Sequence, residues 1–165
     1  MRMLKNRIAD DSLWTLRYDS RRQRWSISAA TVNWVTQASF KPPLVAVGVK
    51  ADFQIHDIIK TAGNFALNVL GNGQQGTAYS FFKPAERDGQ KISGELFRAG
   101  STGVPVLENT PAFVECRLVT TVEEGDHSIF VGEVVDAGVT QEPEGRADEA
   151  TLLLKDLGEK TFYGG

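Results

Sequence analysis

The chain has 165 residues and a formal net charge of -3, with 41% hydrophobic and 24% charged residues. These values are typical of soluble globular proteins, and we expect residues 1–165 to form one domain. The negative charge argues against nucleic acid as a partner, because affinity for a duplex comes mostly from Lys and Arg side chains at the phosphates.

The N-terminal part of the chain predicts strands separated by turns. Residues 13–18 have the composition of a first strand, and residues 25–40 are rich in β-branched and aromatic side chains, which predicts one long or bent strand. Pro42 and Pro43 end this strand, because proline supplies no donor to a strand ladder. The arginine-rich run at 17–24 is expected to be a solvated turn, and an anion site is the less favoured alternative.

The middle of the chain predicts two strands and two helices. The continuous apolar run 44–49 is typical of a strand buried on both faces. Asp52 is placed to cap a helix that ends at Gly63. The side chains expected on the inner side of this helix are Phe53, Ile55, Ile58 and Ile59. Residues 65–70 predict the next strand, and residues 74–82 predict a weaker second helix.

A long polar segment follows the second helix. Residues 83–103 are charged and rich in glycine, with only Ile92, Leu96 and Phe97 to anchor them. The segment is too long for an ordinary connection between elements. We therefore expect a loop that serves as a lid or as an arm contacting a partner.

The C-terminal part predicts a hairpin and one last strand. Residues 112–122 and 128–139 are the hairpin strands, joined by an acidic tip, and residues 151–154 predict the last strand. About seven strands and two helices are expected, and the helices do not alternate regularly with the strands. This pattern favours a mainly β fold, a closed or nearly closed antiparallel barrel with helices at its side. A doubly wound sheet is disfavoured, since no G-x-G-x-x-G turn is present.

The chain lacks the common catalytic motifs. Its two histidines, His56 and His127, and its single cysteine, Cys116, do not have the spacing of metal ligands, so we expect no metal site. There is no P-loop and no G-x-S-x-G turn. Cys116 lies in an apolar run, which favours a buried structural thiol. Such a protein either binds a ligand or relies on a cofactor for its chemistry.

Targeting signals are also missing from the sequence. The N-terminus has no signal-peptide core, and no apolar run reaches the length of a membrane span. A single cysteine allows no disulfide within the chain. We therefore expect a cytoplasmic protein without a membrane partner.

Two groups of polar residues suggest a binding site. Residues 31–40 interleave hydroxyl and amide side chains with apolar ones, so this strand has donors and acceptors for the edge of a planar ring such as flavin; the alternative is a polar face that meets water. Lys50 comes just before a helix start, where a phosphate would be stabilised by free N–H groups and the helix dipole. The alternative for Lys50 is an ordinary surface lysine, and the carboxylate of Asp52 competes for the same N–H groups.

The two histidines receive different interpretations. His127 stands at the hairpin tip, where it is suited to orient a nicotinamide or to supply a proton near neutral pH. The equally weighted alternative is a turn histidine that is hydrogen-bonded to Asp126. His56 is expected to lie on the surface of the first helix.

Three ordered motifs resemble those of the flavin reductase-like, FMN-binding split-barrel family. Residues 33–47, NWVTQASFKPPLVAV, resemble its strand–Pro-Pro–strand signature. Residues 63–70 resemble the strand that follows, and residues 115–134, with the run Gly-Asp-His, resemble its C-terminal hairpin. Residues 81–84 and the polar stretch after them are similar to the flavin reductase module at the C-terminus of cyanobacterial diflavin flavoproteins.

The resemblance implies a fold, a cofactor and a site. It implies a Greek-key split β-barrel with two flanking helices, which forms a homodimer and holds non-covalent FMN in a groove near the subunit interface. The residues that it assigns to FMN are Thr31, Asn33, Trp34, Val35, Thr36, Ala38, Ser39, Lys50, Phe53 and Gln54, and His127 is assigned to the catalytic position beside the nicotinamide. Many members have Ser and Thr in the phosphate turn, where this chain has residues 51–54, ADFQ.

The activity implied is that of an NAD(P)H-dependent flavin reductase, which passes electrons to free flavin or to a redox partner protein. One alternative is an electron carrier that does not react with NAD(P)H and whose segment 83–103 docks the partner. Another is an FMN-binding module without turnover. The sequence does not choose between NADH and NADPH.

Overall fold

The structure is a computed structural model that describes residues 11–19 and 24–163, with side chains from residue 27 onward. The arginine-rich run at 17–24 lies outside the described side chains, so its assignment to a solvated turn stays a prediction. The described chain is built on two antiparallel sheets, one of seven strands and one of four.

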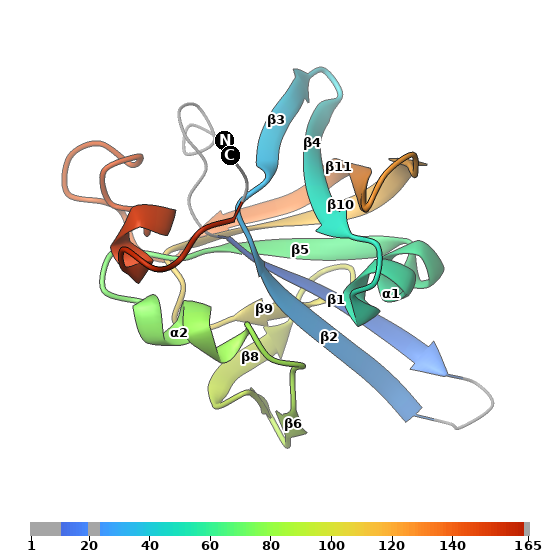
Figure 1. Cartoon of the computed structure of the whole chain (residues 1–165), viewed down its shortest axis with the longest axis horizontal. Coiled ribbons are helices and arrows are strands. Elements are labelled where there is room, and N and C mark those ends of the chain that lie inside the picture. The colour runs from blue at the N-terminus through green and yellow to red at the C-terminus, as the bar shows by residue number, and fades with distance from the viewer. Residues whose placement is uncertain (1–10, 20–23, 164–165) are drawn as a thin grey trace.

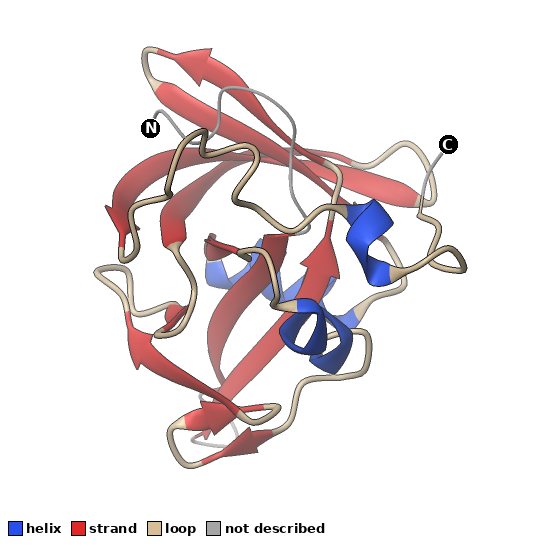
Figure 2. Cartoon of the chain, turned by 90° about the vertical axis from the view of Figure 1, so that its left-hand side faces the viewer, coloured by secondary structure: helices blue, strands red, loops and turns tan. Residues whose placement is uncertain are grey.

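The large sheet curls into a barrel (Figure 1, Figure 2). Its strands lie in the order β2-β1-β5-β10-β11-β4-β3. Their bounds are β1 (Asp11–Asp19), β2 (Arg24–Val32), β3 (Val35–Phe40), β4 (Pro43–Lys50), β5 (Asn64–Val69), β10 (Ala112–Val122) and β11 (His127–Val139). The outermost strands, β2 and β3, are joined through only Asn33 and Trp34, so the two ends of the sheet must approach each other. This confirms the expected antiparallel barrel.

Two strand predictions need correction. The segment 25–40 is not one strand, because β2 ends at Val32 and β3 begins at Val35. The segment 44–49 is fully buried on one face only: Val45, Val47 and Val49 are buried, whereas the residues between them are half-buried. On the second face, the side chain of Trp34 lies against Gly48.

Helix α1 (Gln54–Ala62) ends at Gly63, as predicted, where a φ of 71° favours glycine. Ile55, Ile58 and Ile59 are buried, but Phe53 precedes the helix and is 42% exposed. Asp52 does not cap the helix; its carboxylate instead accepts a hydrogen bond from Lys50 at 2.9 Å.

His56 is the clearest error of sequence interpretation. Its imidazole is buried, and its Nε2 lies 2.8 Å from the hydroxyl of Ser128 on β11. The ring also meets the edge of Phe130, with 5.2 Å between ring centroids. A neutral polar residue can face the core when such a partner satisfies it.

The segment 83–103 is folded, so the expected long loop is wrong. It forms β6 (Arg87–Asp88), β7 (Lys91–Ile92) and β8 (Glu95–Ala99), which join β9 (Pro105–Leu107) in the small sheet. Ile92 is completely buried and packs with Ala66 and Phe81, whereas Leu96 stays 45% exposed. Leu107 of β9, beyond the polar stretch, belongs to the same buried cluster.

The remaining helices lie on the side of the barrel opposite α1 (Figure 1, Figure 2). Helix α2 (Gln75–Ser80) is shorter than predicted. The predicted last strand is reduced to one bridge between Thr151 and Gly71, and a short 3-10 helix, η2 (Leu154–Leu157), follows. Leu152 and Leu157 are buried against Leu70, which follows β5, and against Ala78 of α2. This packing brings the end of the chain back to the barrel.

The barrel interior holds the main core, which contains Cys116 as predicted. None of the helices among the described residues is long and apolar enough to cross a membrane.

Candidate functional site

A groove runs along the C-terminal end of strand β2. It consists of two adjoining pockets of about 200 and 230 Å³ that share Ala30, Phe53, Phe81 and Phe82. The floor is β2, one wall is the start of α1, and the other wall is the segment after α2 together with the C-terminal segment.

The two halves of the groove differ in chemistry. The first pocket is lined mostly by apolar and aromatic side chains, with Thr31 and Asn33 as polar groups at the floor. The second pocket contains Asp52, Gln54 and Lys83. The first half therefore suits a flat, largely apolar ring, and the second half suits a polar or charged extension of it.

Strand β2 offers its backbone to this groove. It is the terminal strand of the large sheet and pairs only with β1 among the described strands. An edge strand presents N–H and C=O groups that no ladder uses. Such groups can hydrogen-bond the polar edge of a ring, whereas the side chain of Thr31 is already engaged: its hydroxyl donates to the carbonyl of Ala78 at 2.7 Å.

Three rings meet at one end of the groove, where β2 passes into β3. Trp34 and His127 have ring centroids 4.5 Å apart, and Tyr163 lies 5.5 Å from Trp34 and 5.8 Å from His127. Gly48 makes room for Trp34, because a Cβ at this glycine would lie 3.0 Å from the indole ring. We call Trp34, His127 and Tyr163 the aromatic cluster.

The imidazole of His127 is held from both sides. Its Nδ1 lies 2.9 Å from Asp126 Oδ1, and its Nε2 lies 2.6 Å from the hydroxyl of Tyr163. A carboxylate only accepts, so in the neutral imidazole Nδ1 carries the proton and Nε2 accepts from the tyrosine. The hydrogen bond from His127 lowers the pKa of Asp126. The contact with Asp126 predicted for a turn histidine is thus present, together with the ring contact on Trp34.

Lys50 stands next to His127, since the two are paired across β4 and β11. Its ammonium group lies 2.9 Å from Asp52 Oδ2 and 5.5 Å from the ring centroid of Phe53. The hydrogen bond to Asp52 raises the pKa of Lys50. The described start of α1 has no side-chain cap. The N–H of His56 donates to the carbonyl of Phe53 at 3.0 Å, so the N–H groups of Gln54 and Ile55 are the ones suited to an anion.

The structure brings most, but not all, of the predicted residues together. Thr31, Asn33, Phe53 and Gln54 line the groove, and Trp34, Lys50 and His127 stand at its end. Val35 instead lies in the main core. Thr36, Ala38 and Ser39 belong to the hairpin of β3 and β4, which projects from the barrel away from the groove (Figure 1). Contact of these four residues with a flavin stays a prediction.

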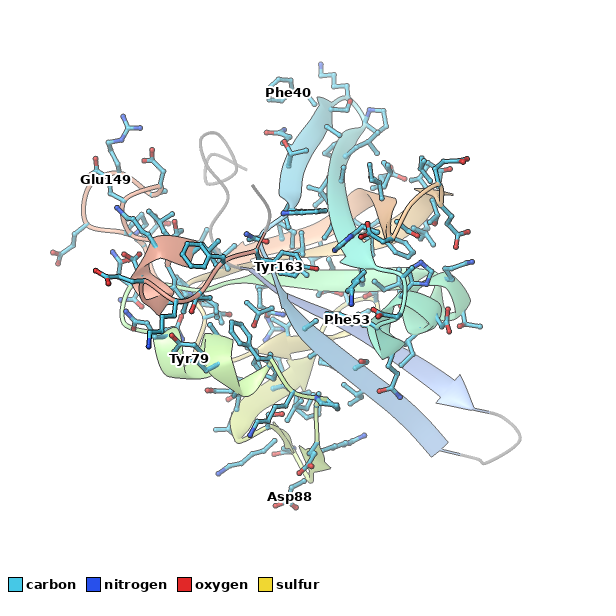
Figure 3. All side chains as sticks on the ribbon, in the orientation of Figure 1. Phe40, Phe53, Tyr79, Asp88, Glu149 and Tyr163 are labelled. Carbon is cyan, nitrogen blue, oxygen red and sulfur yellow. The ribbon has the colours of Figure 1, made fainter. Side chains whose placement is uncertain are left out.

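Sequence reasoning missed the second wall of the groove. Phe81, Phe82 and Lys83 follow α2, and residues 154–163 bring five further side chains, among them Phe162 and Tyr163. Figure 3 shows Tyr163 near the centre of the molecule, and Tyr163 and Phe53 line the same pocket. Two adjacent aromatic residues near the end of a polar tail were the signal available in the sequence.

The chain has relatives of known name. Residues 13–158 match the family described as flavin reductase like domain. A flavin reductase of Pseudomonas putida is 34% identical over 129 residues, which cover 78% of this chain and 71% of that protein. A diflavin flavoprotein of Synechocystis is 31% identical over 114 residues, which cover 68% of this chain but only 20% of that much longer protein.

Solved structures show the same fold. BorF, the flavin reductase component of a bacterial two-component tryptophan halogenase, superimposes with a TM-score of 0.68 at 27% identity, covering 88% of this chain and 91% of BorF. Among the described residues, no group of three His, Cys, Asp or Glu side chains is placed to hold a metal ion. The match over most of the chain settles the family: this protein belongs to the flavin reductase-like family of oxidoreductases.

Proposed function

We propose that this flavin reductase binds FMN non-covalently in the groove beside β2 and takes its electrons from NADH or NADPH. The observation that carries the proposal is the junction of an apolar, ring-sized pocket with the start of α1 and Lys50. FMN consists of a flat ring system joined through a short chain to a phosphate, and the two halves of the groove match these parts in order.

The ring system of FMN would lie in the first pocket. The unpaired backbone edge of β2 suits the polar rim of the ring, and Phe53 and Phe82 suit its apolar part. FMN, when bound, would supply the two-electron redox chemistry, and the chain would position the rings and exclude water. His127, at the mouth of the groove, is the residue we assign to the nicotinamide.

The phosphate of FMN would lie near the start of α1. The uncapped N–H groups and Lys50 favour an anion there, while the carboxylate of Asp52 opposes it. This turn has no Ser or Thr, so the backbone and Lys50 must provide most of the binding. We therefore expect FMN to bind, but with a phosphate contribution that Asp52 weakens.

We also infer a homodimer. The hairpin of β10 and β11 exposes several apolar side chains: Val119, Val122, Ile129, Val135 and Val139, each 42–55% exposed. Exposed apolar side chains in this number on one hairpin support an association surface. Sedimentation of the purified chain at dimer mass supports this inference, and monomer mass at micromolar concentration contradicts it.

The final electron acceptor and the cellular location belong to the same proposal. We place the protein in the cytoplasm, because its single cysteine is buried and needs no oxidising compartment.

Electrons would leave to free flavin or to a partner protein. BorF is named as the reductase component of a two-component halogenase, which supports a protein partner.

A titration tests the binding half of the proposal. Purified chain is titrated into FMN, and into riboflavin as the matched ligand without phosphate, while flavin fluorescence is followed. Saturable binding of both, with FMN the tighter ligand, is expected. No change in the FMN signal at saturating protein would overturn the flavin site.

A further inference from the structure

The C-terminal segment crosses the mouth of the groove and is anchored there. The hydroxyl of Tyr79 donates to the carbonyl of Leu157, and the hydroxyl of Thr161 donates to the same carbonyl at 3.2 Å. Leu157 itself is buried against Ala78 of α2. These contacts hold the residues just before Tyr163 against the barrel. The position of Tyr163 at the groove results from this packing.

Tyr163 contacts three residues of the proposed site, although it lies far from them in the sequence. Its hydroxyl meets His127 Nε2 at 2.6 Å, its carbonyl accepts from the Asn33 amide at 3.1 Å, and its ring lies 5.5 Å from that of Trp34. The residue is 40% exposed, and one side of its ring is therefore open to the groove or to solvent.

The contact on His127 determines how the imidazole is held. Asp126 binds Nδ1, but it is itself exposed at the hairpin tip, and a single hydrogen bond leaves the ring free to tilt. The second hydrogen bond from Tyr163 fixes the plane of the ring over Trp34 and engages Nε2. Burial raises the pKa of Tyr163, so the hydroxyl keeps its proton at neutral pH and serves as the donor.

We propose that Tyr163 is a positioning residue of the flavin reductase site, holding His127 in one tautomer and one orientation while its ring forms part of the wall around the bound ring system. The inference rests on the proposed function for its effect on turnover. The effect on the imidazole itself does not depend on flavin and can be measured in the flavin-free chain.

The opposite role is that Tyr163 blocks the groove. Its carbonyl and hydroxyl engage Asn33 and His127, two groups that a ligand would otherwise contact. A blocking residue and a positioning residue have opposite effects on affinity: removal of the former tightens FMN binding, and removal of the latter does not.

The test combines two variants and a matched control. Tyr163→Phe keeps the ring and removes the hydroxyl, and Tyr163→Ala removes both. The control, Thr140→Val, removes a hydroxyl that donates to the carbonyl of Thr110, where neither residue lines the groove. The first readout is the nitrogen NMR signals of the imidazole in the flavin-free chain, assigned with His127→Gln, since the chain has only two histidines. The second readout is FMN affinity, and the third is the kcat and KM for NADH.

We expect Tyr163→Phe to move the Nε2 signal of His127 toward that of an imidazole nitrogen without a donor. FMN affinity should change by less than about twofold. The kcat should fall about fivefold, which corresponds to the loss of one hydrogen bond. Thr140→Val should leave the His127 signals in place. Unchanged His127 signals in Tyr163→Phe, equal shifts in Thr140→Val, or tighter FMN binding by Tyr163→Ala each overturn the inference. A wild-type chain that shows the His127 signals but no turnover counts instead against the proposed function.

Discussion

Cys116 shows how completely the barrel interior excludes water. Burial is the main cause that raises the pKa of its thiol from 9.0 to about 12, and the charge of Glu115 adds to it. Above about pH 9 the unfolded chain loses this proton while the folded chain keeps it. The stability that the protonated thiol contributes is therefore complete below pH 9 and is lost as the pH rises toward 12.

This gives a prediction for stability at high pH. Urea denaturation of wild type and Cys116→Ala is compared at neutral pH and at about pH 10. We expect wild type to lose more of its unfolding free energy than the variant over this interval, because only wild type carries the thiol. An equal loss in both proteins would show that Cys116 is not buried as described.

Gly48 controls the position of Trp34. A methyl group there would lie 3.0 Å from Cε3 and 3.1 Å from Cβ of Trp34, and the N–H of Gly48 donates to the Trp34 carbonyl at 2.7 Å. Gly48→Ala should displace the indole from His127, lower stability by about 1–3 kcal/mol and weaken FMN binding several-fold. The control is Gly76→Ala, where a Cβ meets nothing within 4 Å. Equal FMN affinities for the two variants would contradict the placement of Trp34.

Asp52 provides a test of the phosphate position. Its carboxylate accepts a hydrogen bond from Lys50 beside the start of α1. Asp52→Asn removes the negative charge, so we expect FMN to bind about fivefold more tightly, as for a charge near a helix N-terminus. Riboflavin, which has no phosphate, should bind wild type and variant equally. If both ligands gain equally, the phosphate does not lie near Asp52.

At the scale of elements, strand β10 fixes the small sheet to the barrel. Glu115 is completely buried, and its carboxylate accepts from the N–H groups of Ser101 and Thr102 and from the hydroxyl of Thr102, at 2.6–3.0 Å. These residues form the turn between β8 and β9. One acidic side chain thus satisfies three donors of a turn that has little apolar packing.

Glu115→Gln should be strongly destabilising. The amide keeps one acceptor oxygen and replaces the other by a donor. One N–H group of the turn then faces an NH₂ group beside β10, which should lower the unfolding free energy by about 3 kcal/mol. The matched control is Glu133→Gln on β11, whose carboxylate pairs only with the exposed Arg117 and should cost less than about 1 kcal/mol. Equal midpoints for the two variants in urea would contradict the role of Glu115.

The elements also show what the sequence can and cannot predict. Helix α1 and the hairpin of β10 and β11 were predictable, because periodicity and turn residues are local signals. His56 was misplaced because its burial depends on the hydroxyl of Ser128, 72 positions away. The strands β6, β7 and β8 were missed because their few apolar residues, such as Ile92, pack against distant parts of the chain, among them Ala66 and Leu107.

At the scale of the whole molecule, the site is built from distant parts of the chain. The predicted residues at the groove come from β2 and its link to β3, the end of β4, the start of α1 and the hairpin tip. Another part, the C-terminal segment, has no motif of its own, and Tyr163 reaches Asn33 across 130 positions. Barrel closure brings these parts together. The fold and the flavin were predictable from motifs in the chain, whereas the second wall was not, because the C-terminal segment carries no motif. That residues 1–165 form one domain stays a proposal.

The central claim is that FMN bound in this groove accepts hydride from a nicotinamide, and one measurement tests it most directly. The FMN-loaded chain is mixed anaerobically with NADH and, separately, with NADPH, while the absorption band of oxidised flavin is followed. We expect rapid bleaching with at least one of the two. Saturating FMN that stays oxidised with both would contradict the claim and indicate an electron carrier or a binding module.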